Sequence, residues 1–144
     1  MGTIVAIQIS RERGTPKQET EIARFVADYG IEGDAHAGTW HRQVSLLAEE
    51  EIEAFKKRGA EVTNGAFGEN MIVRDIDLDS LKIGDRLCAG EVLLEITQKG
   101  KECHNGCAIF QTMGECIMPK KGVFAKVLRG GSLQKDMEIF PVLH

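Results

Sequence analysis

Residues 86–98 have the sequence RLCAGEVLLEITQ, in which two apolar runs lie on either side of one glycine. Because Gly90 separates the runs so closely, the pattern predicts a tight β-hairpin. Further short apolar runs occur at residues 3–10, 42–48, 71–73, 123–128 and 137–142. Short strands at this spacing favour a mainly β fold, a closed or partly closed β-barrel.

One clear helix is expected within this β-rich pattern, over residues 49–58. It begins with three glutamates and ends with Lys56, Lys57 and Arg58, and Gly59 occupies the C-terminal cap position. This order of charges suits the helix dipole. The apolar face is a narrow stripe of Ala48, Ile52 and Phe55, which predicts a helix packed on the outside of a sheet.

Three other segments give weaker patterns. Residues 21–29 fit both a helical face and a strand, and we interpret them as a strand because they are rich in β-branched and aromatic side chains. Residues 75–81 predict a loop or a single helical turn. Pro141 lacks a backbone donor, which predicts that the last strand lies at the edge of its sheet.

The length and composition set the broad class of protein. A chain of 144 residues is expected to form one domain, over residues 1–144. The N-terminus resembles neither an export signal nor a membrane span, so a cytoplasmic location and no membrane association are expected. The net charge of -4, without a basic stripe, gives little electrostatic basis for nucleic-acid binding.

The chemistry is expected to centre on residues 100–107, GKECHNGC. Cys103 follows a predicted strand and lies close to Lys99, Lys101 and His104. Nearby positive charge stabilises a thiolate, which can attack, carry sulfur or bind a soft metal. The alternative is that Cys103 is a small buried hydrophobic residue at a strand end.

The chain has four cysteines, and disulfides are not expected in the absence of an export signal. Cys107 is four residues beyond Cys103, near enough on a helix for a shared metal or for a thiol that accepts sulfur. Cys116 follows later, but this spacing is unusual for a zinc finger, so a structural zinc is only an alternative. Cys88 lies within a strand pattern, which predicts a packing role.

Two glycine-framed loops carry further polar candidates. The first, residues 30–38, contains Asp34 and His36, with His41 shortly after it. Two histidines and a carboxylate can bind a metal or an oxyanion, although the same residues also stabilise tight turns. The second loop, residues 65–70, has the sequence GAFGEN and includes Gly68, Glu69 and Asn70.

These segments, taken in order, resemble the MOSC domain, the module named for the C-terminal part of molybdenum cofactor sulfurases. The matching stretches are GIEGDAHAG at 30–38, RQVSLL at 42–47, GAFGEN at 65–70, residues 78–84, and LEITQ at 94–98 onward to Cys103. The resemblance implies a barrel-like β fold with a pocket at one end. It also implies an association with the molybdenum cofactor, with Cys103 carrying sulfur or binding molybdenum.

The resemblance leads to a set of expected site residues. Catalytic roles are expected for Cys103, His104, Asp34 and His36, and a molybdenum site is expected at Cys103 with Cys107. The residues expected to bind the cofactor are Arg42, Gly68, Glu69, Asn70, Lys101 and Arg129. Arg42 and Arg129 are included because a guanidinium can hold a phosphate through two hydrogen bonds.

The expected function is binding of the molybdenum cofactor or transfer of its sulfur, together with a sulfur donor or acceptor protein. A first alternative is a molybdenum-dependent reductase of N-hydroxylated compounds. A second is a non-catalytic module with zinc at the cysteine cluster. Pyridoxal phosphate is not expected, because the chain has no room for the desulfurase domain of the sulfurases.

Overall fold

The computed structural model describes residues 2–11, 18–35, 37–57, 59, 69–99 and 122–142. The first half of the chain contains β1 (Gly2–Ile9), β2 (Gln18–Thr20), β3 (Ile22–Val26), β4 (Gly30–Ile31), β5 (Val44–Ala48) and α1 (Glu49–Lys57). The second half contains β6 (Met71–Arg74), η1 (Leu78–Ser80), β7 (Arg86–Ala89), β8 (Val92–Lys99), β9 (Val123–Arg129), β10 (Gly131–Gln134) and β11 (Glu138–Pro141).

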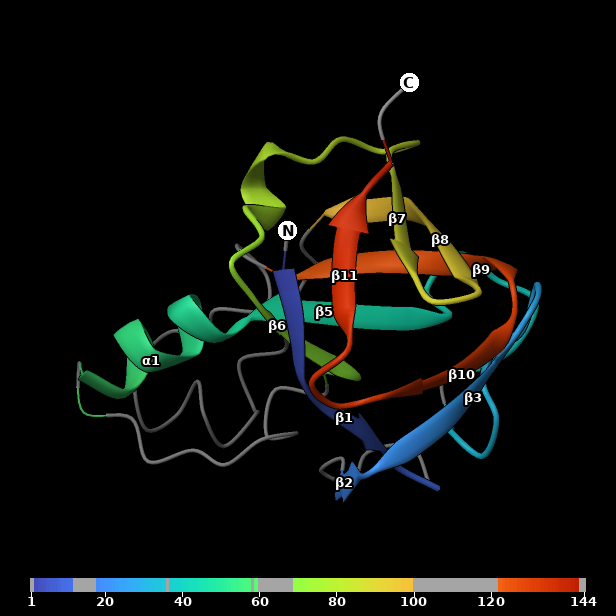
Figure 1. The fold of residues 1–144 in the computed structure, drawn as a ribbon, viewed down its shortest axis with the longest axis horizontal. Coiled ribbons are helices and arrows are strands. Elements are labelled where there is room, and N and C mark those ends of the chain that lie inside the picture. The colour runs from blue at the N-terminus through green and yellow to red at the C-terminus, as the bar shows by residue number, and fades with distance from the viewer. Residues whose placement is uncertain are drawn as a thin grey trace.

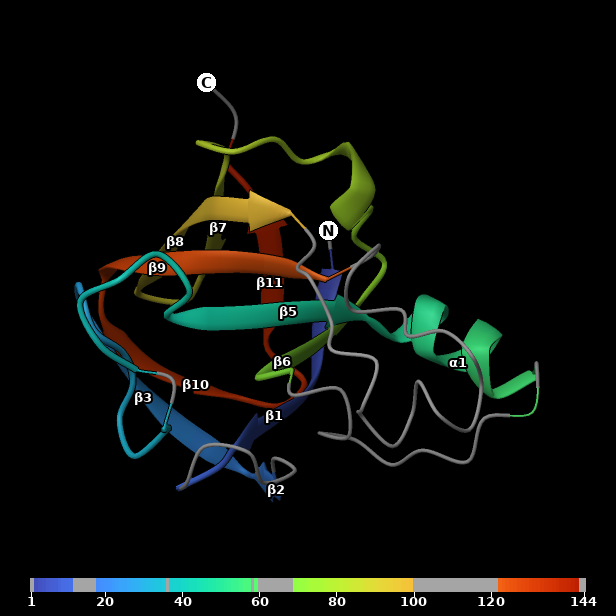
Figure 2. The ribbon, with the colours of Figure 1, turned by 180° about the vertical axis from the view of Figure 1, so that it is seen from behind.

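The main sheet closes on itself to form a barrel (Figures 1 and 2). Its strands pair in the order β11, β7, β8, β9, β5, β6, β1, and β1 pairs back onto β11. Strands β5 and β6 are parallel, and their connection begins with α1. The other pairings in the ring are antiparallel. The predicted closed β-barrel is confirmed.

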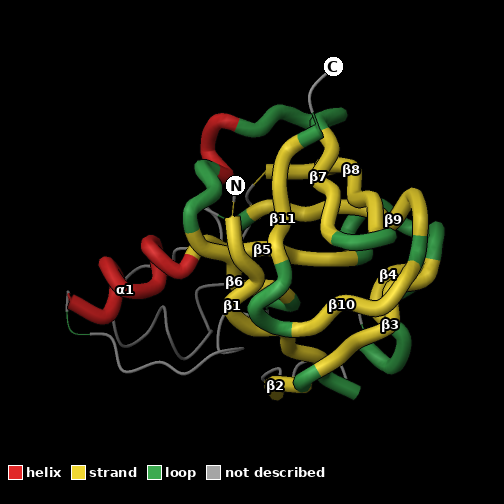
Figure 3. The backbone as a smooth tube through the Cα atoms, in the orientation of Figure 1, coloured by secondary structure: helices red, strands yellow, loops and turns green. Residues whose placement is uncertain are grey.

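Two smaller pieces extend the barrel. Strand β2 pairs with the far end of β1, and a second sheet has the order β10, β3, β4. In the tube view of Figure 3, β10 and β3 run across the end of the barrel opposite η1. The buried side chains Phe25 and Leu133 come from this small sheet and join the same hydrophobic core.

The interpretation of residues 21–29 as a strand is confirmed by β3, and the hairpin around Gly90 is confirmed by the pairing of Ala89 with Val92. The expected helix is also present, with Ile52 and Phe55 buried. It contacts β5 and β6. In the described residues, no helix is both long and apolar enough to cross a membrane.

The prediction that the last strand lies at an edge is wrong. Strand β11 pairs with β1 through Glu138 and Ile139, and with β7 through Phe140 and Pro141. Pro141 is tolerated because it is the final residue of the strand, where the sheet can do without its backbone donor. The short strands β2 and β10 were also not predicted.

The two faces of the barrel strands differ sharply. In β5, Val44, Leu46 and Ala48 belong to the hydrophobic core, while Ser45 and Leu47 alternate with them and face outward. The core is filled by apolar side chains from every strand of the ring. The interior is packed with apolar side chains. Polar side chains that could bind a ligand or take part in a reaction therefore lie on the outer face or in the loops.

This alternation is testable in β8 with two neighbouring residues. Leu94 is buried in the core, and Glu95 points outward to a long ion pair with Lys126. Leu94→Ala should lower the free energy of unfolding by about 2 to 5 kcal/mol, because it leaves a cavity. Glu95→Ala should change it by less than about 1 kcal/mol. Urea unfolding of both variants measures the difference, and equal losses would contradict the inward and outward assignment.

Candidate functional site

A row of outward-facing side chains crosses five neighbouring strands of the barrel. It runs from Gln98 on β8 through Phe124 on β9 and Ser45 on β5 to Asn70, directly before β6, and Gln8 on β1. Phe124 is the register partner of both Gln98 and Ser45, and Asn70 donates its backbone N–H to the Ser45 carbonyl. We call these five residues the outer row.

Asn70 is the hub of the outer row and is almost fully buried. Its Oδ1 accepts hydrogen bonds from the backbone N–H and the hydroxyl of Ser45, at 3.0 and 3.1 Å. Its Nδ2 donates to the Gln8 carbonyl and to Asp34 Oδ2, both at 3.1 Å. One side chain therefore connects β1, β5 and the loop that carries Asp34.

Asp34 is held on both of its oxygens. Oδ1 accepts the backbone N–H of Ser10 at 3.0 Å, and Oδ2 accepts Asn70 Nδ2. The chain reaches this position through Gly30, where φ is +126° and an added Cβ would lie 2.8 Å from the Gln43 carbonyl oxygen. Only glycine fits there. Gly30 and Ile31 form β4, so the loop predicted over residues 30–38 begins two residues later than expected.

Gln8 provides an acceptor of a different kind. Its side chain is fully buried, and Nε2 donates to the Glu69 carbonyl at 3.2 Å. Its Oε1 is buried and has no hydrogen-bond partner among the described residues. A buried acceptor without a donor costs about 1 to 3 kcal/mol, so this position favours any molecule that can donate a hydrogen bond.

The other end of the outer row is cationic. Gln98 Oε1 accepts Arg42 Nε at 2.9 Å and is also 2.9 Å from His41 Nε2. The guanidinium carbon of Arg42 lies 5.3 Å from the centre of the Phe124 ring, within the range of a cation–π interaction. The His41 carbonyl accepts the hydroxyl of Thr97. Arg42 and His41 are thus fixed on neighbouring positions of the outer face.

The structure brings together part of the site predicted from the sequence. Asp34 and Asn70 are in direct contact, and Arg42 lies above Phe124 in the same outer row. Arg129 is elsewhere, five residues or roughly 17 Å further along β9, where its Nε donates to the Glu91 carbonyl at 2.7 Å. Cys103, His104, His36, Gly68, Lys101 and Cys107 lie outside the described residues.

The sequence analysis missed Gln8, Ser45 and Gln98. Each is a polar residue within an apolar strand pattern, which is also the ordinary signature of a solvent-facing position. Gln8 and Ser45 are nevertheless buried. A polar residue flanked by apolar ones was the available signal, but it does not say which outward positions are covered.

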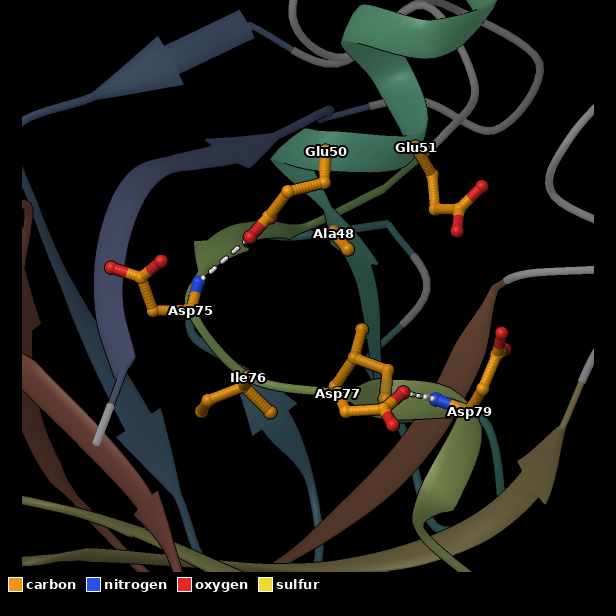
Figure 4. Close-up of a pocket in the computed structure, with 8 residues that line it drawn as sticks. Ala48, Glu50, Glu51, Asp75, Ile76, Asp77 and Asp79 are labelled. Carbon is orange, nitrogen blue, oxygen red and sulfur yellow. Dashed lines mark hydrogen bonds between the residues drawn. The ribbon is translucent and has the colours of Figure 1, made fainter.

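A separate pocket of about 380 Å³ lies where β5 and β6 lead into α1 and η1 (Figure 4). Glu50 Oε2 accepts the backbone N–H of Asp75 at 3.0 Å, and Asp77 Oδ1 accepts that of Asp79 at 3.1 Å. With Glu51, five carboxylates line the cavity. Their combined charge makes this pocket unfavourable for a phosphate or another anion.

Arg74 lies close to this pocket and is paired with Glu49. Arg74 Nε donates to Glu49 Oε1 at 2.8 Å, and this hydrogen bond with the carboxylate charge raises the pKa of Arg74. Arg74 is therefore paired, whereas Arg42 has no carboxylate partner among the residues that the structure describes. Within the part of the chain that the structure describes, no group of three or more His, Cys, Asp or Glu residues is arranged to hold a metal ion.

Residues 33–139 match the model of the MOSC domain family. The match begins one residue before Asp34 and ends in β11, so it covers four residues of the outer row but not Gln8, which lies on β1. The chain belongs to the MOSC domain family. Proteins of this family are associated with the molybdenum cofactor. A comparison with curated proteins found no match.

Solved MOSC-like structures share the fold of this chain. The YuaD protein from Bacillus subtilis superposes with a TM-score of 0.79 at 21% sequence identity, covering 96% of this chain and 94% of that protein. YiiM from Geobacillus stearothermophilus has a TM-score of 0.76 at 20% identity, with 99% and 76% covered. YiiM from Escherichia coli has a TM-score of 0.69 at 21% identity, with 100% and 71% covered.

The role of the Asn70 hub can be measured by stability. Asn70→Ala should lower the free energy of unfolding by about 2 to 4 kcal/mol, because it removes four hydrogen bonds within a buried site. Gln134→Ala, at an exposed position of β10, is the control and should change it by less than about 0.5 kcal/mol. Similar urea midpoints for Asn70→Ala and wild type would contradict the assigned role.

Proposed function

We propose that this MOSC protein binds the molybdenum cofactor and carries sulfur on Cys103. The observation that carries the proposal is Arg42. It is half-buried, its Nε is held by Gln98 and one face of its guanidinium lies on Phe124. Among the described residues, its terminal nitrogens have no acceptor, so they are suited to the phosphate of the cofactor.

The donor and acceptor groups of the outer row support the same proposal. Arg42 offers donors at one end. At the other end, Gln8 Oε1 is a buried acceptor that has no hydrogen-bond partner among the described residues. Three strand spacings separate Phe124 from Gln8, or roughly 14 Å. A pterin with a phosphate has N–H donors at one end and an anion at the other, which matches this order of groups. When bound, the cofactor supplies a molybdenum centre with a preference for soft sulfur ligands.

Chain connectivity limits the distance between Cys103 and the end of β8. Gln98 belongs to the outer row, and Lys99 ends β8 with its Nζ donating to the Asp79 carbonyl at 2.6 Å. Cys103 is four residues beyond Lys99, a span of at most about 14 Å. This short span supports the proposal that Arg42, Lys99 and Lys101 stabilise the thiolate of Cys103.

The proposed reaction is thiol–persulfide exchange with a partner protein. The Cys103 thiolate attacks the outer sulfur of a persulfide on a donor protein, and a new S–S bond forms on Cys103 as the bond in the donor breaks. The donor leaves as a thiolate, so no external oxidant or reductant is required. His104 is the candidate for holding the proton that is exchanged with the thiol. We place this exchange in the cytoplasm.

The direct test compares Cys103→Ala with Cys107→Ala, both produced in a host with ample molybdenum. Wild type and Cys107→Ala should retain pterin, molybdenum and labile sulfur. Cys103→Ala should lose labile sulfur and molybdenum by at least about tenfold, because the soft ligand is gone. Metal analysis, pterin fluorescence and thiol mass spectrometry measure the three contents.

The outcomes separate the alternatives for this site. Loss of all three contents in Cys107→Ala, with Cys103→Ala unchanged, would overturn the assignment of the sulfur carrier. Molybdenum retained by Cys103 without any persulfide would support the reductase instead. Zinc in place of molybdenum would support the non-catalytic module.

A further inference from the structure

A row of apolar side chains crosses the outer face of β11, β7 and β8. Phe140 is the register partner of Cys88, and Cys88 is the register partner of Leu93. Phe140 is 38% exposed, and the other two are half-buried. The row ends on β9 at the exposed Arg129, which pairs with Leu93. In Figure 1, β11 and β7 lie toward the viewer with no described helix or strand in front of them.

A charged row lies beside the apolar row, two residues along the same strands. Arg86 on β7 and Glu95 on β8 are register partners. Glu95 leans away from Arg86, and its Oε2 lies 4.0 Å from Nζ of Lys126 on β9. The side chain of Arg86 is exposed and has neither an ion pair nor a hydrogen bond among the described residues. This face therefore presents a cation that could accept a carboxylate from outside the chain.

We propose that two copies of this chain associate through this face as a symmetric dimer. The two-fold axis lies in the interface, midway between β7 and β8 and nearly parallel to them. Rotation about this axis places β7 of one copy opposite β8 of the other. Arg86 then faces Glu95 of the second copy, and Cys88 faces Leu93 of the second copy. At the flanks, the ring of Phe140 faces the guanidinium of Arg129, a pair suited to a cation–π contact.

The charges on the face select this axis over its neighbours. A two-fold interface uses the same patch on both copies, so every contact occurs twice. An axis along β7 would place Arg86 against Arg86, and an axis along β8 would place Glu95 against Glu95. Like charges in contact cost several kcal/mol in an interface. Only the axis between the two strands pairs opposite charges and keeps the apolar side chains together.

The shape of the barrel limits the strength of the dimer. The surface curves away on both sides of β7 and β8, so these two strands make the closest contact, and the long side chains of Phe140 and Arg129 reach across the flanks. The contact is smaller than the roughly 800 Å² per partner of a standard interface, so we expect a dissociation constant in the micromolar range. Gln98 lies five residues beyond Leu93 on β8, so the dimer leaves the Arg42 end of the outer row open.

Sedimentation equilibrium of the full chain, from about 5 to 500 µM, measures the association. Arg86→Glu should raise the dissociation constant of the dimer by at least about tenfold, because it places two carboxylates opposite each other at both copies of the contact. Phe140→Ser should raise it by about fivefold. Arg24→Glu is the matched control, since it makes the same charge reversal at an exposed position on β3, and it should associate as wild type does.

A mixing experiment tests the pairing itself. Glu95→Arg alone should weaken association as strongly as Arg86→Glu does. An equimolar mixture of these two variants should form a heterodimer with a dissociation constant within about threefold of wild type, because two acidic positions then face two basic ones. Native mass spectrometry identifies the heterodimer by its mass. Mixing changes neither chain, so an effect of the substitutions on folding cannot produce this rescue.

Three results would overturn the proposal: a wild-type chain that stays monomeric up to about 500 µM, equal weakening by Arg24→Glu and Arg86→Glu, or a mixture no more associated than its separate variants. Should circular dichroism show that Arg86→Glu does not fold, Phe140→Ser decides, and an unchanged dissociation constant in that variant would also overturn it. The association requires neither Cys103 nor Arg42, so it is tested independently of the proposed function.

Discussion

The candidate site depends on the buried carboxamide of Asn70. Its oxygen satisfies the backbone and hydroxyl of Ser45, and its nitrogen satisfies Asp34 and the carbonyl of Gln8. No apolar side chain of similar size could replace it, since the four hydrogen bonds of the carboxamide with these groups would be lost. The contact between the glycine-framed loop and β6 therefore has a defined geometry.

The packed interior of the barrel explains why the candidate site lies on its outer face. A ring of this size has an interior that its own side chains fill, as the core residues Ile7, Leu46 and Leu94 do here. Outward positions alternate with these core positions, and closure brings the outward positions of strands distant in sequence into one row. Gln8 and Gln98 thus belong to the same outer row although 90 positions separate them in the sequence.

The two ends of strand β5 lie beside side chains of opposite charge. Arg42 and His41 lie together where β5 begins, and the carboxylates of Glu50, Asp75 and Asp77 lie where β5 and β6 end. Strand β5 separates the two groups. An anionic ligand is therefore favoured at the start of the strand and repelled at its end, which supports an oriented mode of binding across the outer row.

Local patterns were sufficient for the helix, for most strands of the barrel and for several site residues. Alternating apolar residues predicted these strands, the charge order of residues 49–58 predicted the helix, and glycine spacing located the loop of Asp34. These features depend on interactions between residues close in the chain, so a single sequence contains them.

Local sequence patterns could not predict which strands, distant in the sequence, pair with one another. The position of β11 between β1 and β7, the burial of Gln8 and Ser45, and the meeting of His41 with Gln98 all require strands distant in sequence to lie side by side. The alternation of a strand distinguishes its two faces but does not identify its neighbours. Closure of the barrel supplies those neighbours, and with them the outer row.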